Sequence, residues 1–203
     1  MGYFPLFIDL QDKPCLIVGG GAVAARKAEK LLPYGPKLTL VAPEFHPDLC
    51  ALLGVLRIER AFLPDDIAGQ TLVIAATDDP AENRVIRSLC QARSIPVNVV
   101  DNKDLCTFLF PCLIKRGDLS IGISTGGASP TAAVWLKKQV EQLVPEGFDA
   151  LLAWLEAQRP RIKAAIPEAK RSAVFSGLFA ACVALGRPMT EMELQNFLEE
   201  EGR

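Results

Sequence analysis

The sequence predicts an α/β fold with a mostly parallel β-sheet, followed by a small helical domain. Four short runs rich in branched apolar residues recur with helix-like segments between them, at residues 15–19, 37–42, 71–76 and 95–100. These runs are continuously apolar, which is typical of parallel strands buried on both faces. The C-terminal stretch of roughly 55 residues combines helix-forming residues with helical spacing and lacks this rhythm.

Length and charge limit the classes of partner. The chain has 203 residues, half of them hydrophobic, which is enough for a sizeable core. Its net charge of -2, from 22 basic and 24 acidic residues, lacks the basic footprint of nucleic-acid or anionic-membrane binders. No signal peptide or membrane span is visible. We therefore expect a cytoplasmic protein with a small-molecule partner, without nucleic acid and without a membrane.

Two helices are predicted between the apolar runs. In the first, the apolar stripe consists of Ala24, Ala28, Leu31 and Leu32, whereas Arg26, Lys27 and Lys30 lie outside it. The second begins with Asp79 as N-cap and Pro80 at the first helical position. Together with the runs, these helices give a repeated βαβ pattern.

The pattern changes after about residue 105. Two strands are expected around a turn at residues 116–118, and a helix is expected from Pro130 to about Val144, with Ser129 as its N-cap. The remaining tail is predicted to be helical, with breaks at Pro160, Pro167 and Gly186.

Three consecutive glycines separate the first run from the first helix. The spacing Gly19-x-Gly21-x-x-Ala24 in "GGGAVA" matches the Rossmann dinucleotide fingerprint. The first glycine permits a sharp turn, the second lets the backbone approach a pyrophosphate, and the small third residue lets helix and strand pack closely. The helix N-terminus then faces the anion. The alternative is a glycine-rich turn that binds nothing.

The end of the second run bears on the choice of dinucleotide. The usual acidic position holds Ala42, and the nearest carboxylate is Glu44, 23 residues after Gly21. No arginine follows to receive a 2'-phosphate, which favours NAD over NADP. Glu44 also fits the description of a solvated loop acid.

Three further residues follow the third and fourth runs. Thr77 and Asp78 are expected at the carboxyl edge of the sheet, where open α/β folds bind ligands, whereas Asp79 is interpreted as a helix cap. Asp101 is expected at the same edge. A carboxylate there, partly shielded from water, would have a raised pKa and act as a general acid or base. A plain turn residue is the competing interpretation.

No metal site is predicted. The six cysteines form no CxxC pair and are interpreted as small apolar side chains in a reducing compartment. The sole histidine, His46, is interpreted as a loop residue.

Several motifs together resemble a known family. "CLIVGGGAVAARKAEKLL", "LTLVAPE", "IAATDD", "PVNVVD" and "ISTGGASP", over about residues 3–145, look like the precorrin-2 dehydrogenase / sirohydrochlorin ferrochelatase family, the N-terminal module of siroheme synthase. The resemblance implies a Rossmann domain over 1–112, a dimerisation segment over 113–146 that links two chains into a homodimer, and a helical domain over 147–203.

The resemblance also implies an activity, NAD-dependent oxidation of precorrin-2 to sirohydrochlorin for siroheme or cobalamin synthesis. It implies Asp101 as the catalytic carboxylate. It extends the cofactor contacts from the glycines, including Gly20, to Ala22, Val23, Pro43 and Glu44. A second, ferrochelatase activity stays open, and so does a non-catalytic NAD- or tetrapyrrole-binding role.

The substrate of that reaction carries carboxylate arms and needs cationic or N–H partners. Backbone donors are expected from the loop residues Thr125, Gly126 and Gly127 at the start of a helix. Charge is available from five bases that, taken singly, also fit solvated surface residues: Arg116, Lys137, Lys138, Arg159 and Arg161.

Overall fold

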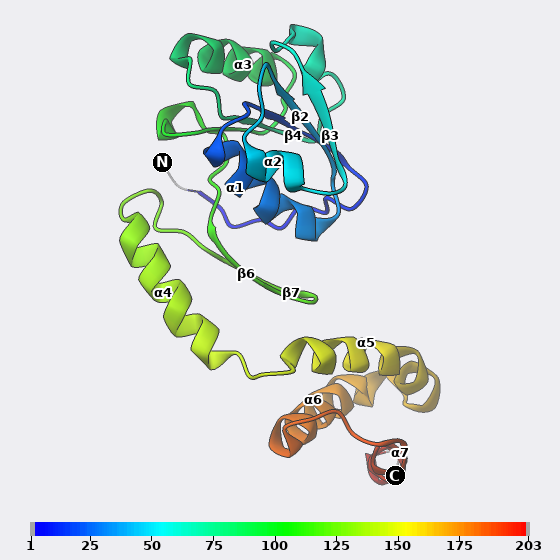
Figure 1. The fold of residues 1–203 in the computed structure, drawn as a ribbon. Helices are drawn as coiled ribbons and strands as arrows, with labels where there is room; N and C mark the ends of the chain where they lie inside the picture. The colour runs from blue at the N-terminus through cyan, green and yellow to red at the C-terminus, as the bar shows by residue number, and fades with distance from the viewer. Residues whose placement is uncertain (1–2, 202–203) are drawn as a thin grey trace. The chain divides into compact units, whose positions relative to one another are not determined.

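A computed structural model describes residues 3–201. The chain divides into two compact units (Figure 1). The first consists of residues 1–112 and 122–133, and the second of residues 113–121 and 134–203. The sheet-bearing first unit carries the residues on which the proposed chemistry depends.

A five-stranded, fully parallel sheet forms the centre of the first unit, in the order β3-β2-β1-β4-β5. Its strands are β1 (Pro14–Val18), β2 (Lys37–Ala42), β3 (Val55–Glu59), β4 (Leu72–Ala75) and β5 (Val97–Val99). The four predicted runs correspond to β1, β2, β4 and β5, which confirms the α/β fold.

Strand β3 is absent from the prediction. It contains Arg57 and Glu59 and lies at the sheet edge, where it pairs only with β2. None of its residues is fully buried. With charged residues and only partial burial, β3 therefore lacks the mainly apolar run by which the other four strands, including the opposite edge strand β5, were recognised.

The helices of the first unit are α1 (Ala22–Leu31), α2 (Pro47–Ala51) and α3 (Pro80–Ala92), with 3-10 turns at Leu32–Tyr34, Pro64–Ile67 and Lys103–Leu105. Asp79 caps α3 as predicted, because its Oδ1 accepts a hydrogen bond of 2.7 Å from the N–H of Ala81. The α2 helix, like β3, was not anticipated.

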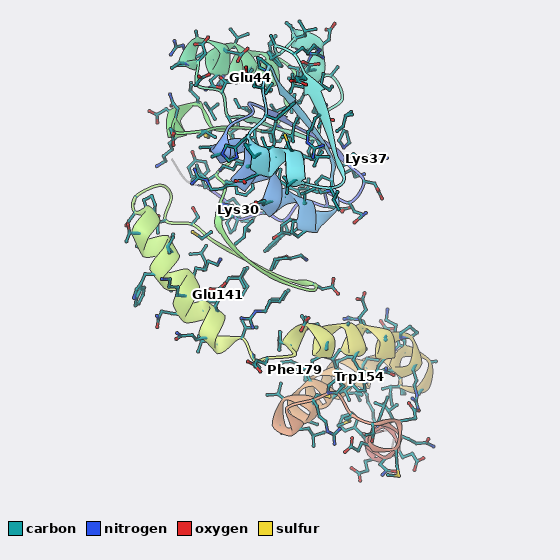
Figure 2. The ribbon with its side chains drawn as sticks, in the orientation of Figure 1. Lys30, Lys37, Glu44, Glu141, Trp154 and Phe179 are labelled. Carbon is teal, nitrogen blue, oxygen red and sulfur yellow. The ribbon has the colours of Figure 1, made fainter. Side chains whose placement is uncertain are left out.

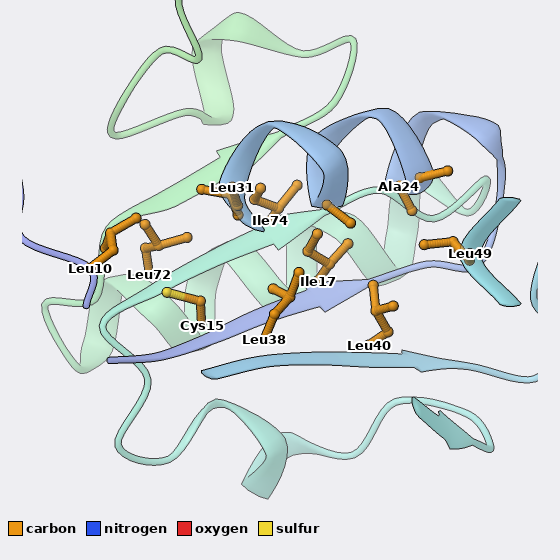
Figure 3. Close-up of a cluster of buried hydrophobic side chains, with 12 residues drawn as sticks. Leu10, Cys15, Ile17, Ala24, Leu31, Leu38, Leu40, Leu49, Leu72 and Ile74 are labelled. Carbon is orange, nitrogen blue, oxygen red and sulfur yellow. The ribbon is translucent and has the colours of Figure 1, made fainter. Parts of the chain in front are cut away.

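Apolar side chains cover both faces of the sheet. In β1, Cys15 and Ile17 belong to the cluster beneath α1, whereas Leu16 and Val18 belong to the cluster on the opposite face. Figure 3 shows the first cluster, with Ala24 and Leu31 of α1 facing the strands. Successive strand residues point to opposite faces, so burial of both faces requires the uninterrupted apolar runs.

The second unit is mainly helical. It contains most of the hairpin of β6 (Cys112–Arg116) and β7 (Leu119–Ile123), most of α4 (Pro130–Leu143), and α5 (Phe148–Ala165), α6 (Glu168–Leu185) and α7 (Glu191–Glu201). Buried apolar residues of α5, α6 and α7, among them Ile162, Leu178 and Leu194, form its core.

The predicted break at Pro160 is wrong, since Pro160 lies inside α5. Proline removes the hydrogen bond that the carbonyl of Glu156 would accept in a regular helix. Both Pro160 and Glu156 are exposed, so the lost hydrogen bond lies on a side of the helix where water can replace it. The other two predicted ends are confirmed, because α5 stops before Pro167 and Gly186 caps α6 in the left-handed conformation.

Candidate active site

The three consecutive glycines form the turn between β1 and α1. Gly19 has φ +128°, and a Cβ atom there would collide with the carbonyl oxygen of Ala76, at the end of β4. A Cβ atom on Gly20 would collide with the carbonyl oxygen of Glu44, after β2. Around Gly21, no heavy atom lies within 4 Å of the corresponding position. The turn is therefore closed on its protein side and open at Gly21, as a backbone cradle for a diphosphate requires.

The glycine turn leads directly into the first turn of α1, whose backbone N–H groups are not capped. Gly21 is the N-cap, and no side chain caps the helix. The N–H groups of Ala22, Val23 and Ala24 therefore have no intrahelical partner, and the positive end of the helix dipole lies there. Ala24 is fully buried, which gives the close packing of helix on strand that a small residue allows.

Pro43 and Glu44 lie beside the glycine turn. Both are exposed and follow the carboxyl end of β2 (Figure 2 labels Glu44). The N–H of His46 donates a 2.7 Å hydrogen bond to the carbonyl of Gly20, which ties this segment to the turn. His46 itself caps α2, since its Nδ1 accepts from the N–H of Asp48, and it is exposed as expected of a loop residue.

The segment after β4 contains an internal hydrogen-bond network. The hydroxyl of Thr77 donates to Oδ1 of Asn83 at 2.9 Å, and Nδ2 of Asn83 donates to the Thr77 carbonyl at 3.0 Å. Asn83 is buried. Thr77 is thereby fixed at the sheet edge with its hydroxyl already engaged, whereas Asp78 is exposed.

Asp101 lies just beyond β5, at the carboxyl edge of the sheet. It adopts φ +57°, a left-handed conformation that is uncommon outside glycine and is enriched at functional sites. The side chain is exposed in the single chain. The expectation of a carboxylate partly shielded from water is therefore wrong for one chain alone.

A cavity of about 610 Å³ contains Asp101 in its wall. Its lining comes from α1, from the segment after β5 and from the loop before α4, all within the first unit. Four bases line it, namely Arg26, Lys27, Lys30 and Lys103, against the single acid Asp101. The cavity is therefore cationic, although the chain as a whole is slightly acidic.

The loop at residues 124–129 forms another part of this wall. Thr125 and Gly127 line the cavity, but the N–H of Gly126 donates to Oγ of Ser124 at 3.1 Å. A Cβ atom on Gly127 would lie 2.9 Å from Cδ of Lys103, so the Lys103 side chain crosses the loop closely. Ser129 caps α4 as predicted, accepting from the N–H of Ala132 at 3.1 Å.

Lys27 and Asn98 are among the cavity residues that were not predicted as site residues from the sequence. Nζ of Lys27 lies 3.4 Å from Oδ1 of Asn98 and 4.2 Å from the centroid of the Phe110 ring. Burial, followed by the positive charge of Lys30, lowers the pKa of Lys27 from its ordinary 10.5 to about 8. Asn98 is the one polar residue in the run "IPVNVV", and this was the signal in the sequence that could have marked it as a site residue. No comparable signal in the sequence distinguishes Lys27.

Four of the five bases suggested for substrate carboxylates have other contacts in the second unit. Arg116 donates to the carbonyl of Val144 at 3.1 Å, and Lys137 pairs with Glu141 at 3.5 Å. The remaining contacts are Arg159 with the Phe175 ring and Arg161 with Glu191. No hydrogen bond or ion pair is present for Lys138 among residues 3–201.

The cysteines and the acids form no metal centre among the described residues, where no group of three or more suitable ligands occurs. All six cysteines are free. Burial raises the pKa of Cys15 and Cys90 to about 11 and also raises that of Cys106, which keeps these thiols protonated and unreactive. No helix within residues 3–201 has both the length and the apolar character to span a membrane.

Comparison with known proteins identifies the family. A sequence model described as "Putative NAD(P)-binding" matches residues 6–112, and one described as "Sirohaem biosynthesis protein central" matches residues 116–143. The siroheme synthase of Thioalkalivibrio sulfidiphilus is 43% identical over 83% of this chain and 35% of its own length. That of Methylococcus capsulatus is 39% identical over 100% of this chain and 42% of its own length.

The chain thus spans well under half the length of these curated relatives. A solved structure of "SirC, precorrin-2 dehydrogenase" matches with a TM-score of 0.74 over 98% of both chains, at 22% identity, which shows a shared fold. The first sequence model alone covers more than half of the chain. The chain therefore belongs to the family of the siroheme synthase N-terminal module, with an NAD(P)-binding domain followed by the family's central segment.

Proposed function

We propose that this chain catalyses the NAD-dependent oxidation of precorrin-2 to sirohydrochlorin in siroheme biosynthesis. The observation that carries the proposal is the cationic cavity, in which a carboxylate at the end of β5 faces the helix that follows the glycine turn. The siroheme synthase relatives and the precorrin-2 dehydrogenase of the same fold support the choice of substrate.

The residues of the glycine turn fit a dinucleotide. Gly19 and Gly20 leave no room for a side chain, Gly21 is open, and the first turn of α1 offers free N–H groups. Pro43 and Glu44 would border the adenosine end, and the segment at Thr77 and Asp78 would border the cofactor along the sheet edge. A bound nicotinamide supplies a hydride acceptor.

The protein's own part is to orient the substrate and to accept a proton. Oxidation of precorrin-2 to sirohydrochlorin removes two electrons and two hydrogens, one as hydride and one as a proton. We assign the proton to the carboxylate of Asp101, which lies on the cavity wall. The bases around it neutralise the carboxylate arms of the substrate, and the loop at Thr125 and Gly127 borders the same space.

The reaction is tested by mixing the purified protein with precorrin-2 and NAD under anaerobic conditions. Formation of NADH, followed by its absorbance, together with the absorption spectrum of sirohydrochlorin, is the expected result. Binding of both ligands without turnover would instead favour a non-catalytic NAD- or tetrapyrrole-binding protein. The same measurement therefore separates the two functions that the sequence left open.

We propose NAD rather than NADP as the cofactor. Glu44 is an exposed carboxylate beside the glycine turn, where it would repel a 2'-phosphate and would accept a hydrogen bond from a ribose hydroxyl. We expect kcat/KM for NAD to exceed that for NADP by about tenfold or more, and Glu44→Ala to reduce this ratio at least threefold. Glu59→Ala, which removes an exposed carboxylate from the end of the neighbouring strand β3, is the control. An unchanged preference in Glu44→Ala would refute the role of Glu44.

We propose that the chain forms a homodimer. Helix α4 exposes large apolar side chains, with 62% of Trp135 and 79% of Leu143 accessible. Exposed apolar groups of this size mark association surfaces. Sedimentation should show a dimer, and Trp135→Glu should raise the dissociation constant at least tenfold, whereas Met192→Glu, at a 73% exposed apolar residue of α7, should leave it within twofold. A monomeric wild type contradicts the dimer.

A ferrochelatase activity would also use Asp101, as the group that takes up pyrrole protons when iron enters, and sirohydrochlorin with ferrous or cobaltous ion provides the assay. Insertion of cobalt in this assay would also support a role in cobalamin synthesis.

We place the enzyme in the cytoplasm. Six free cysteines favour this location because that compartment is reducing, and cell fractionation is the test.

A further inference from the structure

Lys27 is a half-buried cation without an acidic partner. Its two close neighbours, the Asn98 amide oxygen at 3.4 Å and the Phe110 ring at 4.2 Å, are both uncharged. None of the ion pairs within residues 3–201 includes Lys27. A partly desolvated charge is costly unless an opposite charge completes it. Asp101 acts on Lys27 electrostatically but forms no ion pair with it, so the lysine can still pair directly with an anionic ligand.

Asn98 fixes the direction of this lysine. It is 5% exposed, and its Nδ2 donates to the carbonyl of Phe108 at 3.1 Å and to Sγ of Cys106 at 3.4 Å. Since a carbonyl only accepts, Nδ2 must face Phe108, and Oδ1 is left to face Lys27. One of the three ammonium hydrogens is therefore engaged with Asn98, and the side chain of Lys27 lines the cavity.

We propose that Lys27 binds a carboxylate arm of the tetrapyrrole and so positions the macrocycle against Asp101. This inference rests on the proposed function and adds a specificity-determining residue to it. Lys27 and Asp101 line the same cavity, and the remaining bases in its wall are more exposed. A charge-assisted hydrogen bond is strongest where water is partly excluded, which singles out Lys27 among them.

Carboxylate binding at this lysine must be linked to protonation. The charged and titratable groups that act on Lys27 are Arg26 and Lys30 on its own helix, and Asp101 and the Cys106 thiol from the segment after β5. With the pKa of free Lys27 at about 8, the ammonium form dominates at pH 7 and is the minor form at pH 9. A bound carboxylate favours the ammonium and raises its pKa again. Affinity is therefore greatest well below pH 8 and falls as the pH rises through and above that value.

The test is a titration of the protein with sirohydrochlorin, without NAD, at pH 7 and pH 9. For the wild type we expect Kd to rise about tenfold between the two, because one pH unit above the pKa leaves about a tenth of the lysine charged. Lys27→Met should bind about tenfold or more weakly at pH 7 and lose most of the pH dependence. Lys27→Arg should retain affinity and show no such rise, because arginine stays charged.

Matched controls separate this role from folding and from the cofactor. Lys37→Met removes an equal charge at the start of β2, outside the cavity lining, and should behave as the wild type (Figure 2 labels Lys37). NAD affinity should stay within twofold in Lys27→Met. If Lys27→Met loses NAD affinity but binds sirohydrochlorin normally, the anion is the cofactor and the proposal is overturned.

Failure of this inference differs from failure of the proposed function. Equal sirohydrochlorin affinities for wild type and Lys27→Met, or a pH dependence that persists in Lys27→Arg, overturn the role of Lys27 even when the wild type forms NADH. If the variants show the predicted binding pattern but the wild type forms no NADH with precorrin-2, the role of Lys27 is supported. Only the proposed oxidation of precorrin-2 is then refuted.

Discussion

Asp101→Asn is expected to lower kcat for precorrin-2 oxidation by about 10²- to 10⁴-fold, the range found when a general base is removed. Asparagine keeps the size and the hydrogen-bonding oxygen of aspartate but accepts no proton. It also tolerates the left-handed backbone at φ +57°, so the turn after β5 should survive. The affinity of this variant for NAD should remain within about twofold of the wild-type value. The residues assigned to the diphosphate follow β1, whereas Asp101 follows β5. Single-turnover measurements of NADH formation give the rate of the chemical step.

Asp104→Asn is the matched control for this variant. Asp104 is an exposed carboxylate in the 3-10 turn that follows, and it does not line the cavity. Its replacement changes the net charge equally and should leave the rate within twofold. If Asp101→Asn is as fast as the wild type, Asp101 is not the base, although the reaction itself stands. If the wild type itself forms no NADH, the proposed reaction is refuted.

The fold was predictable wherever burial on both sides imposes a strong pattern. Strands β1, β2, β4 and β5 could be recognised because each lies in a mainly apolar run and is largely buried. Strand β3 could not, since it contains Arg57 and Glu59 and none of its residues is buried. The prediction that a helix ends at Pro160 was wrong for a different reason. Proline ends most helices, but the lost hydrogen bond is tolerated on the solvent-exposed side of α5, and the sequence alone does not show that exposure.

Some residues of the candidate site could likewise be recognised from the sequence, and others could not. The glycine turn and Asp101 were recognisable because backbone requirements and strand ends leave local signals. Lys27 was assigned to the polar side of its helix, and only the packing of residues 98–110 against α1 reveals that this side faces a cavity. Contacts between residues about 70 positions apart arise from tertiary packing, which no periodicity within one helix encodes.

The second large effect is expected at the glycine turn. Gly19→Ala places a Cβ atom against the backbone carbonyl of Ala76 and imposes φ +128° on a residue that strongly disfavours it. Strain and overpacking together should lower the free energy of unfolding by about 3 kcal/mol. For a chain of this size that corresponds to a fall in Tm of about 6–12 °C. Thermal unfolding followed by circular dichroism, with and without NAD, measures it.

Gly54→Ala distinguishes the collision from backbone strain alone. Gly54 also has a positive φ, +74°, but no heavy atom lies within 4 Å of its added Cβ. It should cost only about 1 kcal/mol and leave NAD affinity unchanged. Gly19→Ala should in addition weaken NAD binding at least tenfold, since relief of the collision moves the turn that cradles the diphosphate. Equal effects of the two variants on Tm and on NAD affinity would mean that the close approach to Ala76 does not shape the cofactor site.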